Sequence, residues 1–138
     1  MIYSYNTKEQ TLAPNTEVVY SVDAIKTGST VTHAAGTGTF VLNKPGYYYV
    51  TVTAVGSASA TTTDPITLTL YNGTTPIAGA TASELSAEAT DIVDLTINTI
   101  IPVRPSCCAV DNTVNLMVVN TGVEAIYTNT TITITKLS

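Results

Sequence analysis

Hydrophobic and polar residues alternate with a period of two along most of the chain, and the period of an α-helix is almost absent. The alternation is clearest in the last strand candidate, where Ile132 and Ile134 stand between threonines. It is longest and most regular in Tyr47–Val55, whose residues are mostly tyrosine, valine and threonine. These residue types favour strands because β-branched and aromatic side chains pack well on a pleated surface. One face of this segment is predicted to carry Tyr48, Val50, Val52 and Ala54.

Further strands are predicted wherever the same alternation is bounded by turn residues. In the first of them, one face is predicted to carry Val18, Tyr20, Val22 and Ala24. The pair Asn72-Gly73 predicts a tight hairpin, since both residues tolerate a positive φ. Ser83–Thr90 has the composition of a helix but lacks an apolar stripe, so we expect a loop or one helical turn. The strands are Glu17–Ile25, Thr39–Leu42, Tyr47–Val55, Ile66–Leu70, Asp91–Ile101 (closed by Pro102 and Pro105), Thr113–Val119 and Thr130–Leu137.

About seven or eight strands at short spacing, joined by Gly, Pro and Asn turns, are typical of an antiparallel β-sandwich. The 138 residues form one domain, because chains divide into separate cores only at about twice this length. We therefore expect an all-β antiparallel sandwich over residues 17–138. Residues 1–16 are expected to form an N-terminal segment that is extended or docks on a partner.

Composition indicates which partners the fold can have. Five Lys and Arg stand against ten Asp and Glu, and no basic block occurs, so nucleic-acid binding is not expected. Charged residues are 11% of the chain, while threonine is about a fifth. The mean hydropathy of +0.26 indicates more apolar surface than one subunit buries, which favours an oligomer. The first ten residues lack the pattern of a secretory signal, and no apolar run is long enough for a membrane helix, so no membrane insertion is expected.

Residues with catalytic or metal-binding chemistry are few. His33 is the single histidine, and no nucleophile motif accompanies it, so we expect no enzyme activity and no catalytic residue. The acidic set Glu84, Glu88 and Asp91 offers oxygen ligands for calcium but lacks the spacing of a calcium loop, so no metal or cofactor is expected. The neighbouring Cys107 and Cys108 are read as one inward and one outward side chain, since a vicinal disulfide is strained.

The middle of the chain resembles the C1q/TNF-like jelly-roll superfamily, in its microbial and phage branch. Phe40, Gly46, Tyr48, Val50 and Val52 have the spacing of the second half of the C1q signature, F-x5-G-x-Y-x-F-x-F/Y, with valines at the last two aromatic places. The upstream half is absent, with Val22, Gly28 and His33 at its places. Downstream, the resemblance continues through Ile66–Leu70 with Tyr71-Asn72-Gly73 and Pro76-Ile77, then through Asp91–Ile101 and Asn115–Val119.

The resemblance implies a homotrimer in which one sheet of each jelly roll packs around a threefold axis. We expect Tyr47, Tyr49, Ile92 and Ile100 near that axis, because they lie on faces that would otherwise be exposed. The sequence then favours a non-enzymatic structural surface protein of a phage virion, such as a capsid decoration or head-fibre protein. It would bind copies of itself and possibly capsid or fibre proteins, at the virion surface. The alternative is a receptor- or glycan-binding module at a fibre tip or on a cell or spore surface. Tyr47–Tyr49 are a candidate sugar-stacking platform, but packing in the core or at a subunit interface accounts for these tyrosines more simply.

Overall fold

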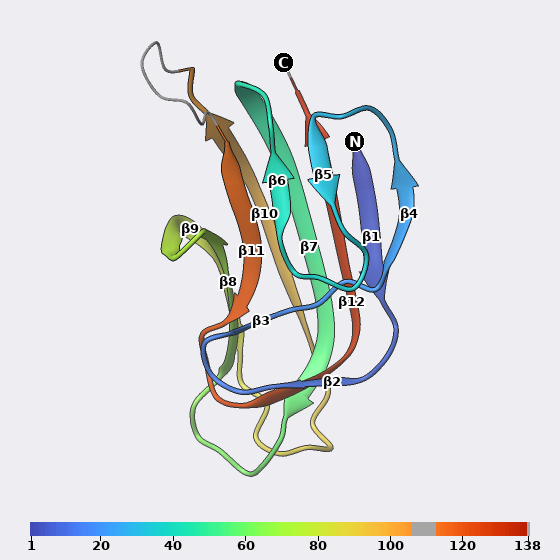
Figure 1. Ribbon diagram of the computed structural model, residues 1–138. Helices are drawn as coiled ribbons and strands as arrows, with labels where there is room; N and C mark the ends of the chain where they lie inside the picture. Colours follow the sequence, from blue (N-terminus) through green and yellow to red (C-terminus); the bar gives the residue numbers. More distant parts are fainter. Residues whose placement is uncertain (106–112, 138) are drawn as a thin grey trace.

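The computed structural model describes residues 1–105 and 113–137, which form two antiparallel six-stranded sheets packed face to face (Figure 1). This confirms the predicted all-β sandwich. Sheet A has the order β10 (Val93–Val103), β7 (Gly46–Ala58), β12 (Ala125–Lys136), β1 (Ile2–Asn6) and β4 (Val22–Lys26), with β2 (Gln10–Leu12) also paired to β12. Sheet B has the order β5 (Val31–His33), β6 (Phe40–Leu42), β11 (Val114–Asn120), β8 (Ile66–Asn72) and β9 (Thr75–Glu84), with β3 (Thr16–Glu17) also paired to β11.

The core lies between the sheets and follows the predicted alternation. In β7 the side chains of Tyr48, Val50 and Val52 are buried, and the residues between them face outward. Ile132 and Ile134 of the neighbouring β12 are also fully buried, opposite Val52 and Val50. Regular alternation therefore divides each long strand into a face in the sandwich and a face outside it.

The turn predicted at Asn72-Gly73 joins β8 to β9. Gly73 has a φ of 62°, a conformation that costs glycine little and other residues more. Its backbone N–H donates to the carbonyl of Asn115, 2.8 Å away on β11. The hairpin is thus attached to the adjacent strand of sheet B.

The prediction for Val22 and Ala24 is wrong, since both are exposed, although Val18 and Tyr20 on the same predicted face are buried. Val18 donates its N–H to Val118 of sheet B, whereas Val22 pairs with Tyr5 of sheet A. The chain crosses from one sheet to the other between residues 20 and 22. A period-two pattern cannot be extended across such a crossing, because the direction of the core changes.

Pro102 does not end its strand, because β10 continues to Val103. The strand is at the edge of sheet A, and Pro102 lies opposite Tyr47 of β7. The Tyr47 carbonyl accepts its hydrogen bond from Leu137 on the other side, so β7 needs no N–H from the proline. An edge strand tolerates proline at such a position. In Ser83–Thr90, the first two residues still belong to β9 and the rest form a loop with no helix.

Residues 1–16, expected as an N-terminal segment, contribute strands to the sandwich. β1 lies between β12 and β4 in sheet A, and β2 pairs with the start of β12. Ile2 and Leu12 are buried in the core. Cys107 and Cys108 lie outside the described residues.

Two large tyrosines bury their hydroxyl groups in the core without a hydrogen-bond partner among the described residues. They are Tyr20, which packs edge-on against Phe40 at 5.4 Å between ring centroids, and Tyr127 of β12. Burial raises the pKa of both phenols above the ordinary value. A buried hydroxyl without a protein partner is costly for a folded chain.

We expect Tyr20→Phe to raise the free energy of unfolding by about 1 kcal/mol at neutral pH, because it removes an unsatisfied buried group. Because the phenol in the folded chain resists ionisation while that in the unfolded chain ionises near pH 10, wild-type stability should fall as the pH rises above about 10. The variant should lose less stability there. Urea denaturation at pH 7 and at alkaline pH measures both effects.

Tyr48→Phe is the matched control. The Tyr48 hydroxyl donates to the Lys44 carbonyl at 2.7 Å and accepts from the Lys44 N–H at 3.3 Å. Its removal is expected to lower the free energy of unfolding by about 1 kcal/mol. Equal destabilisation by Tyr20→Phe and Tyr48→Phe would show that the Tyr20 hydroxyl is satisfied.

Candidate functional site

The outer face of sheet A combines apolar residues with threonine. Its members follow from strand alternation and from the pairing of β10, β7, β12, β1 and β4. Among the described residues, Asp94 is the only charged side chain at these positions. The outer face of sheet A comprises Tyr3, Tyr5, Val22, Ile25, Tyr47, Tyr49, Thr51, Thr53, Val55, Asp94, Thr96, Asn98, Ile100, Pro102, Asn129, Thr131, Thr133, Thr135 and, directly after β12, Leu137.

Tyr49 and Ile100 are direct cross-strand partners on this face. Tyr47 lies two residues before Tyr49 in β7 and is on the same face. In the single chain the exposed fractions are 55% for Tyr47, 40% for Tyr49 and 55% for Ile100. Ile92 is 65% exposed and precedes β10, beyond its pairing with β7. The structure thus brings three of the residues predicted at the threefold axis together and leaves Ile92 outside the paired strands.

Sequence reasoning missed the part of this face that β1 and β4 supply. Tyr3 lies opposite Ile25 and Thr133, and Tyr5 lies opposite Val22 and Thr131. The Tyr3 and Tyr5 rings are 6.1 Å apart between centroids. The period-two pattern of Ile2–Asn6 was the available signal, but it is too short to show which strand lies beside it.

Threonines occupy the centre of the outer face. Thr51 lies between Asn98 and Thr133, and Thr53 lies between Thr96 and Thr131. The hydroxyls of Thr53 and Thr131 hydrogen-bond to each other across the strands. Hydroxyls that pair in this way, with no charge to desolvate, lower the cost of covering the face.

His33 is buried where the edges of the two sheets meet. Its Nδ1 lies 2.6 Å from Asp23 Oδ1 of β4, and its Nε2 lies 2.8 Å from the Thr37 carbonyl. The imidazole stacks on the Phe40 ring at 4.0 Å between centroids. Ser4 Oγ donates to the same Asp23 oxygen at 2.6 Å. Asp23 thus stands between serine and histidine, whereas a catalytic triad needs the histidine in the middle, so this cluster joins β4 to β5 and does not activate Ser4.

Of the acidic set considered for calcium, Glu88 and Asp91 form contacts within the loop after β9, and Glu84 is the last residue of β9. Asp91 Oδ2 accepts from the Ala87 N–H at 3.0 Å, and Glu88 Oε1 accepts from the Thr90 hydroxyl at 3.0 Å. Within residues 1–105 and 113–137, no group of three or more His, Cys, Asp or Glu side chains is arranged to hold a metal ion. The same part of the chain contains no helix long and apolar enough to cross a membrane.

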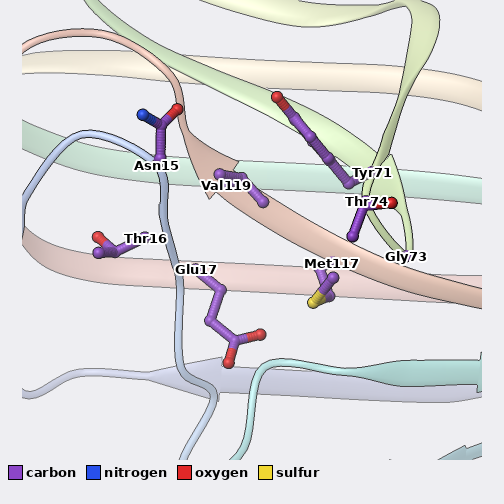
Figure 2. A pocket seen from close by; sticks show the side chains of 8 residues that line it. All are labelled: Asn15, Thr16, Glu17, Tyr71, Gly73, Thr74, Met117 and Val119. Atoms are coloured by element: carbon purple, nitrogen blue, oxygen red, sulfur yellow. The ribbon is translucent and has the colours of Figure 1, made fainter.

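A groove of about 600 Å³ lies on the opposite side of the sandwich, on the outer face of sheet B (Figure 2). Tyr71 of β8 lies opposite Met117 of β11. The segment 15–17 borders the groove on one side, and Gly73 and Thr74 of the β8–β9 hairpin border it on another. We call this the sheet B groove; it is lined by Asn15, Thr16, Glu17, Tyr71, Gly73, Thr74, Met117 and Val119.

Comparison with solved structures shows a TNF-like jelly-roll fold. The chain is similar to the Eiger TNF of S. frugiperda, with a TM-score of 0.70 and 14% identity over 99% of this chain and 92% of that one. It is similar to murine APRIL, with a TM-score of 0.60 and 9% identity over 99% and 98% of the two chains. A phage protein, the PRD1 vertex protein P5, matches with a TM-score of 0.55 and 16% identity over 95% and 93%.

These similarities confirm the C1q/TNF-like jelly roll expected from Phe40, Gly46 and Tyr48. No protein-family model matches the chain, and no curated protein matches it significantly. The similarity is therefore one of fold, which unrelated functions share.

Proposed function

We propose that the protein is a non-enzymatic, homotrimeric structural surface protein of a phage virion, acting as a capsid decoration or head-fibre protein. The observation that carries the proposal is the outer face of sheet A. Exposed apolar side chains border it, threonine hydroxyls fill its centre, and among the described residues Asp94 alone is charged there. A water-exposed face usually carries more charge, so a face of this kind marks a contact between proteins.

Three copies of the chain bury this face around a threefold axis. Tyr47, Tyr49 and Ile100 supply the apolar contacts, as does Ile92 if the loop before β10 reaches the axis. In a closed threefold assembly, the outer face of sheet A is buried in every copy, so no further copy can bind there and the assembly stops at three chains. The C1q/TNF-like fold supports three copies rather than two.

The virion role is supported by the likeness to a phage vertex protein. The non-enzymatic part of the proposal is supported by the names of the structural neighbours, a TNF and a vertex protein. The arrangement of Ser4, Asp23 and His33, which offers no activated nucleophile, supports it as well. A decoration protein needs only surfaces for itself and for a capsid or fibre protein. The trimer is then placed on the outside of the particle.

Sedimentation of the purified chain at micromolar concentration tests the trimer. The expected species has three times the 14.4 kDa mass of the chain. A stable monomer would contradict the proposal. For the virion role, an antibody against the chain is expected to label intact particles from the source culture, and particles without label would contradict that part alone.

A second candidate function is a receptor- or glycan-binding module at a fibre tip or on a cell or spore surface. The sheet B groove favours it, because the groove lies on the face turned away from the proposed axis and stays open in a trimer. A glycan array distinguishes the candidates: reproducible binding supports the module, and binding to capsids without glycan binding supports decoration.

A further inference from the structure

The sheet B groove is built on strands that hold its walls in place. On one side the Asn15 N–H donates to the Asn120 carbonyl at 2.6 Å, and Glu17 pairs with Val119 of β11. On the other side the Gly73 N–H donates to the Asn115 carbonyl at 2.8 Å. Both walls are thus bonded to β11. A groove whose shape is present before binding loses little entropy when a ligand enters.

The floor of the groove is apolar. Tyr71 and Met117 are half-buried cross-strand partners, and Val119 is buried beside them. Figure 2 shows the Tyr71 ring along the groove, with Met117 and Val119 on the neighbouring strand. A half-exposed tyrosine ring offers a flat surface on which the C–H face of a ring-shaped ligand can pack.

Polar groups surround that floor, and the only charged one is acidic. The lining contains the Glu17 carboxylate, the Asn15 amide and the hydroxyls of Thr16 and Thr74, with no Lys or Arg. The Glu17 carboxylate lies beside Gly38, where an added Cβ atom would come within 2.6 Å of its Oε2. Glu17 is exposed, so its carboxylate is accessible to a ligand. A carboxylate accepts hydrogen bonds only, so it suits a ligand with hydroxyl donors.

This combination excludes some ligands. Phosphate, sulfate and acidic ligands would face Glu17 with no cation to pair with. A quaternary ammonium group is usually held by several aromatic rings, and Tyr71 is the one aromatic residue of the lining. A neutral sugar uses every group present, since it has an apolar ring face and hydroxyls that both donate and accept.

We propose that the sheet B groove binds a neutral pyranose, which stacks on Tyr71 and donates hydroxyl hydrogen bonds to Glu17. The volume of about 600 Å³ lies within the usual range for small-ligand sites. This inference rests on the second candidate function and gives it a site and a ligand class. The groove lies within one chain, so it does not depend on the trimer.

Saturation-transfer NMR on the full chain tests the site, with the methyl glycosides of glucose, galactose, mannose and N-acetylglucosamine as probes. At least one probe is expected to receive saturation from the wild type. Titration should then show binding weakened about tenfold or more by Tyr71→Ala and by Glu17→Gln. Tyr71→Phe keeps the ring and should retain most of the affinity. Glu84→Gln, an exposed carboxylate at the end of β9, should bind as the wild type does.

The results of these experiments distinguish a wrong binding site from a wrong proposed function. Binding that survives Tyr71→Ala overturns the groove as the site but leaves a glycan-binding module. No transfer to any of the probes from a trimeric wild type overturns the pyranose site and leaves the structural role. Sedimentation of each variant shows whether assembly and folding are retained, so a misfolded variant is not mistaken for loss of the site.

Discussion

Tyr49→Lys is expected to convert the proposed trimer to a monomer in sedimentation at micromolar concentration. Tyr49 stands between Ile100 and Thr135 on the outer face of sheet A and is 40% exposed in the single chain. A lysine there would place an ammonium group from each copy close to the axis. An unpaired charge taken out of water costs several kcal/mol, and three like charges add their repulsion.

The size of the effect follows from affinity arithmetic. Each 1.4 kcal/mol of lost association free energy weakens binding about tenfold, so a loss of several kcal/mol moves dissociation beyond the micromolar range. Tyr49→Phe keeps the apolar ring and loses only a hydroxyl that donates to Asn98 at 3.5 Å. It is expected to remain trimeric.

Tyr71→Lys is the matched control, with the same substitution on the outer face of sheet B. It should remain trimeric if sheet A faces the axis. A trimeric Tyr49→Lys variant would show that the outer face of sheet A is not the interface. Far-UV circular dichroism of each variant establishes that the strands are retained.

His33→Ala is expected to lower the free energy of unfolding by about 3 kcal/mol, which is a large part of the stability of a domain of this size. The imidazole is fully buried and contacts Asp23, the Thr37 carbonyl and the Phe40 ring. Its removal leaves a cavity beside Asp23, whose side chain is only 13% exposed and keeps the Ser4 hydroxyl as a hydrogen-bond donor but loses the imidazole. Removing one partner of such a buried pair lowers the free energy of unfolding by more than the intact pair contributes to it, because the other partner stays buried without its counterpart.

Urea denaturation measures the effect, and a double-mutant cycle assigns it. Asp23→Ala alone should also be destabilising, and the double variant should lose less than the sum of the single variants, because no unpaired charge remains. Asp64→Ala, at an exposed loop position, should change stability by less than about 0.5 kcal/mol. A loss below about 1 kcal/mol in His33→Ala would show that the cluster does not hold β4 to β5.

The correct predictions came from local patterns. Tyr47–Val55 alternates over a full strand, and Asn72-Gly73 has the backbone freedom that its turn requires. Each lies within one strand or one turn, so neighbouring residues contain the whole signal. The fold class followed, because many such strands with short connections pack only as a sandwich or a barrel.

The errors occurred where a distant strand decides the environment. Val22 left the predicted face because the chain changes sheets after Tyr20. Pro102 remained in its strand because the Tyr47 carbonyl bonds to Leu137 instead. Both outcomes depend on which strand lies alongside, and strand pairing is not a local property.

In the candidate sites, too, some features follow from local sequence patterns and others from the pairing of distant strands. The sequence by itself determined that the strands alternate, that threonine replaces charge, and that Tyr47, Tyr49 and Ile100 would be exposed on one chain. Only the tertiary structure decided that Tyr3 and Tyr5 join them. It also brought His33 to Asp23, and residues 15–17 to Tyr71 and Met117. Alternation follows from the geometry of a single strand, whereas each of these neighbours depends on how segments far apart in the chain are paired and packed.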